Sequence, residues 1–388
     1  MANLIDYVSW RGDIAIGADG FNEVDGLIFA KLCFLDFSGI VPAQGQGSGI
    51  PLQDAAKAYF SGRDGEEEMG LLVPGDIPEL LRCAAASKRF RTMRLNAYEA
   101  RTDETLEEQF AALCFELGDG SVFCAFRGTD DTLVGWKEDL NLSFLDTIPS
   151  QRHALSYLKR IARQYPLRRI RVGGHSKGGN LAVFSAVYAD RAIQRRILQI
   201  CNYDGPGFRE SLEATEGHRR VAARIRTFMP QSSVVGMMLE HEKDVIVVKS
   251  TASGVSQHDG FSWEVLGGSF VHLDDFSREG KRAEETLDSW AESLSLSQRK
   301  AFADALYEVL TSTGARTLSD LNEERLKNAL GMLKTYRGLE KETQQALVGA
   351  MSLLLKYNVR SIRQEMRASQ EGFWKRLEDA WQRLRQPQ

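Results

Sequence analysis

Residues 168–189 read RRIRVGGHSKGGNLAVFSAVYA, a β-branched run, a glycine-rich turn and an alanine-rich apolar segment in succession. This pattern predicts a strand, a tight turn and a helix. Within it, GHSKG at 174–178 fits the G-x-S-x-G pattern, in which flanking glycines let strand and helix approach closely. A serine at the tip of such a turn is accessible to an outside base. Ser176 is therefore the candidate nucleophile, and the backbone N–H of Lys177 is a candidate oxyanion donor.

The same residues have a simpler interpretation, a glycine-rich turn between a strand and a helix or part of a phosphate-binding loop. No Gly-Lys-Ser/Thr closes the turn, so the sequence does not match a P-loop. Strand residues before the serine, helix residues after it, and Gly178 and Gly179 at the junction are the context that a nucleophile elbow requires. The elbow is therefore the favoured interpretation.

The composition is that of an ordinary globular protein, with 388 residues of which 43% are hydrophobic and 26% charged. This length is enough for a large α/β domain and a smaller part. A formal net charge of -4 argues against nucleic acid as the main partner. The first residues contain Asp6, Arg11 and Asp13 and match neither a signal peptide nor a membrane span. The five cysteines lack metal-type spacing, so we expect free thiols in a reducing cytoplasm, no metal and no cofactor.

A second motif precedes the elbow. Residues 109–116 and 121–127 predict two strands joined by a hairpin turn, and the second strand runs into Gly128 and Thr129. A strand that ends in a glycine, with a hydroxyl residue just beyond it, can bring a backbone N–H and a hydroxyl to the elbow. Thr129 is therefore the second candidate oxyanion donor. The alternative is a turn in which Thr129 binds only neighbouring backbone groups.

Taken in order, these motifs resemble those of the class 3 lipases, which are α/β-hydrolases. Those lipases carry F-R-G-[ST] at a strand end, then W-x-x-D-[LF], then an elbow G-H-S-x-G-G. This sequence has FRGT at 126–129, WKEDL at 136–140 and GHSKGG at 174–179. The resemblance implies a mostly parallel sheet flanked by helices. It also implies that residues 130–145 form a lid over an apolar acyl pocket, with an ordinary packed helix as the alternative.

A closer resemblance is to an uncharacterised family of lipase-like proteins of Gram-positive bacteria. It covers most of the first 280 residues and strengthens the expectation of an α/β-hydrolase fold. The segments that carry it are FNEVD at 21–25, GHSKGGNLA at 174–182, YDGPGF at 203–208 and QHD at 257–259.

The candidate base is a histidine that follows the elbow, because the expected chain order in this fold is serine, acid, histidine. His258 lies in a polar loop after the last predicted core strand and is the first choice, with His272 as the reserve. His218 and His241 are interpreted as surface histidines. His175, inside the elbow, is expected to point away from the nucleophile and to pack structurally.

The candidate acid is less clearly marked. Asp204 directly follows the predicted strand at 195–202, and catalytic groups of open α/β sheets gather at such strand ends. Asp244 is the alternative. The segment in which class 3 lipases usually carry the acid has serines here, in QSSVV at 231–235. A missing acid would leave the histidine without control of its tautomer.

We expect three parts: a helical and loop segment packed on the hydrolase (1–92), an α/β-hydrolase core (93–280) and a helical region (281–388). The first contains a predicted amphipathic helix capped by Asn22. The last ends in an aromatic and basic helix at 360–388, with seven basic and four acidic residues. Such a helix either contacts a membrane surface peripherally or docks on the hydrolase or on a second copy of the chain.

These observations predict a cytoplasmic bacterial serine hydrolase that cleaves carboxylic esters, acyl or lipid esters above all, with Ser176, His258 and Asp204 as its triad. A hydrolase scaffold without activity, used as an interaction or membrane-peripheral module, is the alternative from another class. An amidase or a thioesterase would use the same triad.

Overall fold

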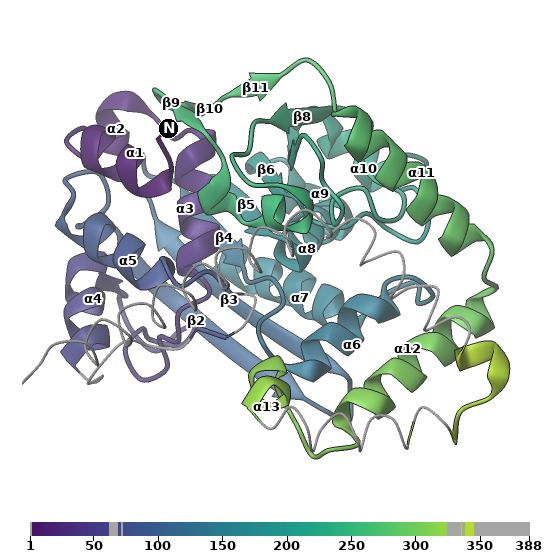
Figure 1. Ribbon diagram of the computed structural model, residues 1–388. Helices are drawn as coiled ribbons and strands as arrows, with labels where there is room; N and C mark the ends of the chain where they lie inside the picture. Colours follow the sequence, from purple (N-terminus) through teal and green to yellow (C-terminus); the bar gives the residue numbers. More distant parts are fainter. Residues whose placement is uncertain (1, 62–68, 71–72, 324–334, 336–337, 345–388) are drawn as a thin grey trace, which may run out of the picture.

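The computed structural model describes residues 2–61, 69–70, 73–323, 335 and 338–344 (Figure 1). Within these residues, nine strands form one mixed sheet in the order β1-β2-β3-β4-β5-β6-β7-β8-β11. Pairing is parallel from β4 to β8 and antiparallel on both sides of this block. The strands are β1 (Ile50–Pro51), β2 (Arg94–Asp103), β3 (Glu108–Glu116), β4 (Val122–Phe126), β5 (Ile170–His175), β6 (Ile197–Tyr203), β7 (Ile225–Pro230), β8 (Val245–Val248) and β11 (His272–Leu273). The carboxyl ends of β4 to β8 therefore meet at one edge of the sheet.

Helices cover both faces of the sheet. The alternation of side chains along β3 shows the two layers, since Leu113 and Phe115 join one core while Ala112 and Cys114 join the other. The first layer contains α1 (Leu4–Arg11), α2 (Ile16–Asp19), α3 (Glu23–Leu32), α4 (Leu52–Ser61) and α5 (Ile77–Ala86). The second contains α7 (Pro149–Gln164), α8 (Lys177–Tyr188), α9 (Arg191–Gln194) and α10 (Glu216–Val221). The α/β class predicted from the sequence is confirmed.

The antiparallel strands at the sheet ends change two details of the prediction. The alternating residues from Met93 in the sequence predict an edge strand, but β1 pairs outside β2. At the opposite end, β11 pairs with β8, which was the last strand expected. The hairpin β9 (Val265–Leu266) and β10 (Ser269–Phe270) forms a separate two-stranded sheet.

Helix α3 begins as predicted but is not amphipathic. The Asn22 side chain accepts hydrogen bonds from the N–H groups of Val24 (3.0 Å) and Asp25 (3.1 Å), and the Asp25 carboxylate accepts the Asn22 N–H (3.0 Å). This is a complete capping box. Every residue from Val24 to Leu32 is buried, because α3 contacts β5 and β6 as well as α5 and β10. The N-terminal segment is thus part of the main core.

A buried ion pair fixes this N-terminal layer. Arg89 donates to Asp25 (Nε to Oδ1, 2.7 Å) and to the carbonyl of Ile14 (3.0 Å). The hydroxyl of Tyr7 also donates to Asp25 (2.8 Å). Burial raises the pKa of the Asp25 carboxyl, and the hydrogen bonds from Arg89 oppose this rise. The pair connects α1, α3 and the end of α5.

The described C-terminal helices lie at the right-hand side and at the bottom of the molecule as drawn in Figure 1. They are α11 (Arg278–Glu292), α12 (Leu296–Thr311) and α13 (Leu318–Glu323). The sequence SLSQ at 295–298 predicts a helix start, and α12 begins there with a capping box between Ser295 and Gln298. The sequence also predicts a helix at 340–357. Most of this helix, and all of the aromatic and basic helix at 360–388, lie outside the described residues. Among the helices that are described, none has both the length and the apolarity that a membrane crossing needs.

Residues 130–145 contain α6 (Leu133–Asn141), which packs between the sheet and α12. The Lys137 ammonium of α6 is buried and binds Asp304 of α12 (2.6 Å), and Arg299 donates to the Ser143 carbonyl (3.0 Å). The N–H of Leu318, in α13, donates to the Asp131 carbonyl (3.0 Å). These contacts are those of an ordinary packed helix, which was the alternative to a lid.

Candidate active site

The elbow joins β5, which ends at His175, to α8, which begins at Lys177. Between them Ser176 has φ 59° and ψ −135°, in a region that non-glycine residues rarely occupy. Two backbone hydrogen bonds hold this strained residue: its N–H donates to the Tyr203 carbonyl (2.9 Å), and its carbonyl accepts from Gly179 (2.8 Å). The turn therefore presents the Ser176 side chain at the carboxyl edge of the parallel strands.

Glycines allow the elbow to approach the end of β4. A Cβ atom on Gly178 would lie 2.1 Å from the Phe126 carbonyl oxygen. A Cβ atom on Gly128 would lie 2.6 Å from the His175 carbonyl oxygen and 3.1 Å from the Ser176 Cβ. The two separations from carbonyl oxygens, 2.1 and 2.6 Å, are too short for a Cβ atom. The stretch that leads into Thr129 thus lies directly against the candidate nucleophile.

The structure brings His258 and Asp204 together. Nδ1 of His258, in the short helix η2 (Gly254–His258), lies 2.7 Å from Oδ2 of Asp204, which follows β6. Asp204 is fully buried, and its other carboxylate oxygen accepts a hydrogen bond from the Ser233 hydroxyl (2.5 Å). Ser233 lies in the segment where class 3 lipases would carry the acid. Here a serine of that segment binds an acid supplied by the neighbouring strand end.

His175 is buried, as expected of a histidine that packs structurally, and it lies against His258. The two imidazole rings are 4.5 Å apart between centroids, and Nε2 of His175 lies 2.7 Å from the His258 carbonyl oxygen. Burial holds the pKa of His175 well below its usual range, and the charges of Lys31 and His258 lower it further. A neutral His175 therefore donates its Nε2–H to the backbone that carries the candidate base.

The Thr129 hydroxyl is bound by a buried acid. It donates to Oδ2 of Asp139, on α6, at 2.5 Å. Burial raises the pKa of Asp139 to about 6, and the charge of Lys177 opposes the rise. While Asp139 is ionised, the hydroxyl proton points to it and not to a substrate, so the backbone N–H of Thr129 is the better oxyanion donor.

The Lys177 side chain points into the protein and contributes nothing to the site surface. Its ammonium binds Glu138 (2.8 Å) and both the side chain (2.8 Å) and the carbonyl (3.0 Å) of Gln109. Glu138 in turn accepts the N–H groups of Gln109 (3.0 Å) and Ser150 (2.9 Å). Lys177 can act on a substrate only through its backbone N–H, the group assigned to it from the sequence.

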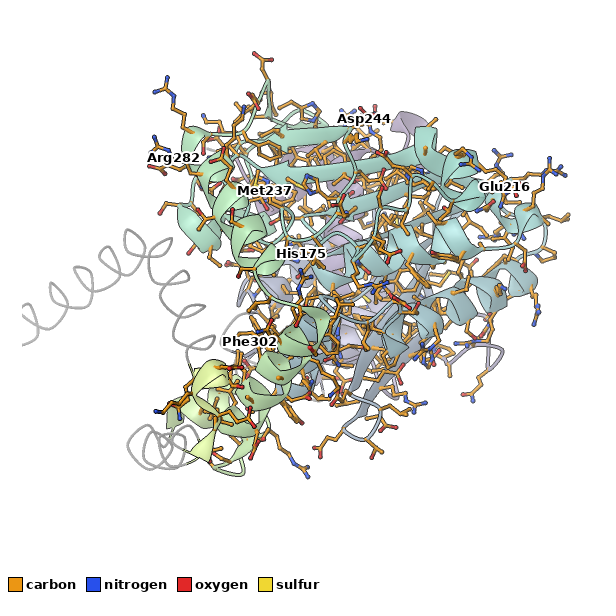
Figure 2. All side chains as sticks on the ribbon, turned by 90° about the vertical axis from the view of Figure 1, so that its right-hand side faces the viewer. His175, Glu216, Met237, Asp244, Arg282 and Phe302 are labelled. Carbon is orange, nitrogen blue, oxygen red and sulfur yellow. The ribbon has the colours of Figure 1, made fainter. Side chains whose placement is uncertain are left out.

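The reserve candidates lie elsewhere. His272, on the edge strand β11, binds Glu23 (2.7 Å). Asp244 is exposed before β8, and Figure 2 shows it near the top of the view, with His175 lower down. His218 was expected at the surface but is buried and binds Glu242 (2.9 Å). All five cysteines are free thiols, and four of them are buried. The described residues contain no group of three or more His, Cys, Asp or Glu side chains that could hold a metal ion.

Sequence reasoning missed several residues around the site. Glu138 and Asp139 are both in the WKEDL motif, which had marked a resemblance without assigning roles. Ser233 was noted only as a departure from the lipase pattern. Lys31, whose ammonium contacts the loop that carries His258, is in no local motif that would mark it as part of the site.

The fold and this site define the class: an α/β protein whose candidate site lies at the carboxyl ends of parallel strands, around a strained serine turn. Residues 84–308 match the family model described as Mbeg1-like, which is more than half of the chain. The chain belongs to the Mbeg1-like family, a lipase-like family. Comparison with the curated proteins finds no match.

Proposed function

We propose that the protein is a serine hydrolase that cleaves carboxylic esters, acyl or lipid esters above all, with Ser176 as nucleophile, His258 as base and Asp204 as acid. The observation that carries this proposal is the 2.7 Å contact between His258 Nδ1 and Asp204, together with the elbow conformation of Ser176 at the end of the neighbouring strand. Membership of a lipase-like family supports the same reaction class.

In the proposed reaction, His258 takes the Ser176 proton as the hydroxyl oxygen attacks the ester carbonyl. The Asp204 carboxylate accepts the Nδ1–H of His258, which fixes the tautomer and leaves Nε2 free to accept that proton. The bond between Ser233 and the other Asp204 oxygen orients the carboxylate. His258 then donates the proton to the leaving alcohol, and water hydrolyses the acyl-enzyme by the same route.

The backbone N–H groups of Lys177 and Thr129 are the proposed oxyanion donors. Lys177 is the first residue of α8, a helix of 12 residues, where backbone N–H groups are unpaired and the helix dipole favours negative charge. Gly128 brings the Thr129 backbone to the same place. Losing one such donor typically costs about a hundred- to a thousand-fold in turnover.

The rival interpretation, an inactive scaffold used as an interaction or membrane-peripheral module, depended on the missing acid of the lipase segment. The contact of Asp204 with both His258 and Ser233 weakens that argument. The helix that would provide a membrane contact lies outside the described residues. An amidase or thioesterase would use the same groups, and only a comparison of substrates separates these activities from ester hydrolysis.

The test is hydrolysis of p-nitrophenyl esters of increasing acyl length, with matched thioester and anilide substrates. We expect wild-type turnover of esters and loss of turnover in Ser176→Ala and His258→Ala. In Asp204→Asn we expect a decrease of about 10⁴-fold, because the imidazole takes the wrong tautomer. His272→Ala and Asp244→Asn, at the reserve positions, should retain activity. Ester hydrolysis that survives Ser176→Ala would contradict the proposal.

A further inference from the structure

Lys31 of α3 is a fully buried lysine, with a side chain that is 1% exposed. Its ammonium forms an ion pair with Asp259 (Nζ to Oδ1, 3.5 Å) and makes no hydrogen bond with any residue that the structure describes. Taking an ammonium out of water is costly unless nearby charge compensates. The buried Lys31 ammonium is therefore expected to lie near groups that compensate its charge.

That environment is the loop that carries His258. Asp259 is the next residue after His258, and a Cβ on Gly260 would lie 3.1 Å from Lys31 Cε. The ring centroid of Phe261 is 5.8 Å from the ammonium. Lys31 therefore contacts three consecutive residues that follow the candidate base, from an element far away in the sequence.

The charge of Lys31 also interacts with the site itself. Burial lowers the pKa of Lys31, whereas the charges of Asp259 and Asp204 oppose this effect. In the other direction, the Lys31 charge is one of the causes that lower the pKa of His175, the residue stacked on His258. The ammonium, the two carboxylates and the two imidazoles thus form one electrostatic group.

We propose that Lys31 is a positioning residue of this site: through Asp259 it holds the His258 loop against the elbow, and its positive charge opposes protonation of His258. The inference rests on the proposed hydrolase function. An aspartate beside a histidine favours the protonated imidazolium, which cannot accept the Ser176 proton. A cation that contacts the same loop counteracts that effect.

Besides Lys31, other charged or titratable groups lie near His258. They are Asp204 at the end of β6, His175 at the end of β5, Asp139 on α6 and Asp259 in its own loop. Removing the Lys31 cation makes protonation of His258 easier. The acid limb, which is the fall of the labelling rate at low pH, therefore moves to higher pH. Removing the Asp259 anion makes protonation harder, so the limb moves to lower pH. The two substitutions are therefore predicted to act in opposite directions.

The test is the rate at which a fluorophosphonate labels the full-length protein, measured from pH 5 to pH 9. We expect Lys31→Met to slow labelling at neutral pH and to raise the midpoint of the acid limb by about half a unit or more. Lys31→Arg, which keeps the charge, should have the wild-type midpoint. Asp259→Asn should have a lower midpoint than wild type. Lys159→Met, which removes a cation paired with Asp190 on another face, is the control for net charge.

The outcomes separate this proposal from the proposed function. If wild type is not labelled, the hydrolase function fails. If wild type is labelled and the two variants keep its midpoint, or shift it in the same direction, the role of Lys31 is overturned. Should Lys31→Met fail to fold, as judged by circular dichroism, the direction of the shift in Asp259→Asn decides, because Asp259 is partly exposed and its replacement is isosteric.

Discussion

Asp139 combines deep burial with a contact to the candidate oxyanion residue. Burial raises the pKa of its carboxyl to about 6. Because this value exceeds the value of about 3.9 in an unfolded chain, the folded state binds the proton more tightly. Protonated Asp139 therefore favours folding below about pH 4, and this contribution is lost as pH rises through the folded pKa. A rise of the Asp139 pKa from about 3.9 to about 6 corresponds to about 3 kcal/mol of unfolding free energy.

Asp139→Asn tests this linkage, because asparagine keeps an oxygen for the Thr129 hydroxyl but does not titrate. Between pH 4 and pH 7 we expect the unfolding free energy of wild type to fall by about 2 kcal/mol relative to that of the variant. Urea denaturation at a series of pH values measures the difference. Asp244→Asn, at an exposed position, should follow the wild-type curve. A difference between wild type and Asp139→Asn that does not change with pH would be inconsistent with a raised pKa.

For individual site residues, the sequence was informative where the residue belongs to a local motif. The strained turn at Ser176 follows from the glycines around it, which are adjacent in the chain. The choice between Asp204 and Asp244 could not be made from the sequence, because it depends on which strand end reaches His258. Ser233 was noticed only because it is not an aspartate, and its bond to Asp204 exists only in the folded chain.

Among the elements, α6 and α8 are connected by the buried pair of Glu138 and Lys177. Both side chains are fully buried, and the carboxylate also accepts N–H groups from β3 and α7. A buried ion pair stabilises a fold weakly relative to an apolar pair, but removal of one partner leaves an uncompensated charge. The pair therefore fixes α6 relative to the elbow helix.

A double-mutant cycle measures this coupling. We expect Lys177→Met alone to lower the free energy of unfolding by about 3–5 kcal/mol, because Glu138 is left as a buried anion. Adding Glu138→Gln should recover much of that loss, since a neutral amide tolerates burial better than an anion. Lys57→Met removes a largely exposed pair with Asp54 and should change stability little. Additive effects of the two buried substitutions would show that the groups are not coupled.

Helix α3 illustrates how far the sequence predicts an element. Its start was predictable from Asn22 and Asp25, because a capping box is local. Its environment was not, since the apolar pattern resembles an amphipathic helix while contacts from the sheet, α5 and β10 bury all sides. The role inferred for Lys31 depends on that burial, because a lysine on an exposed face would be screened by water.

At the scale of the whole molecule, the candidate site is assembled from distant parts of the chain. The N-terminal layer supplies Lys31, the edge of the sheet supplies Thr129, Ser176 and Asp204, and a later loop supplies His258. The α/β class was predictable because the chain alternates strands and helices around the elbow. The contact between Lys31 and Asp259 was not, since no local pattern connects α3 with the loop after β8. The C-terminal helix α12 completes the arrangement by covering α6.

The most direct test of the central claim is to treat the intact protein with a fluorophosphonate and to locate the adduct by mass spectrometry of its peptides. We predict one adduct, on Ser176, which is lost in Ser176→Ala and forms far more slowly in His258→Ala. An unmodified protein that is folded by circular dichroism, or an adduct on another residue, would contradict the claim that this elbow holds an activated nucleophile.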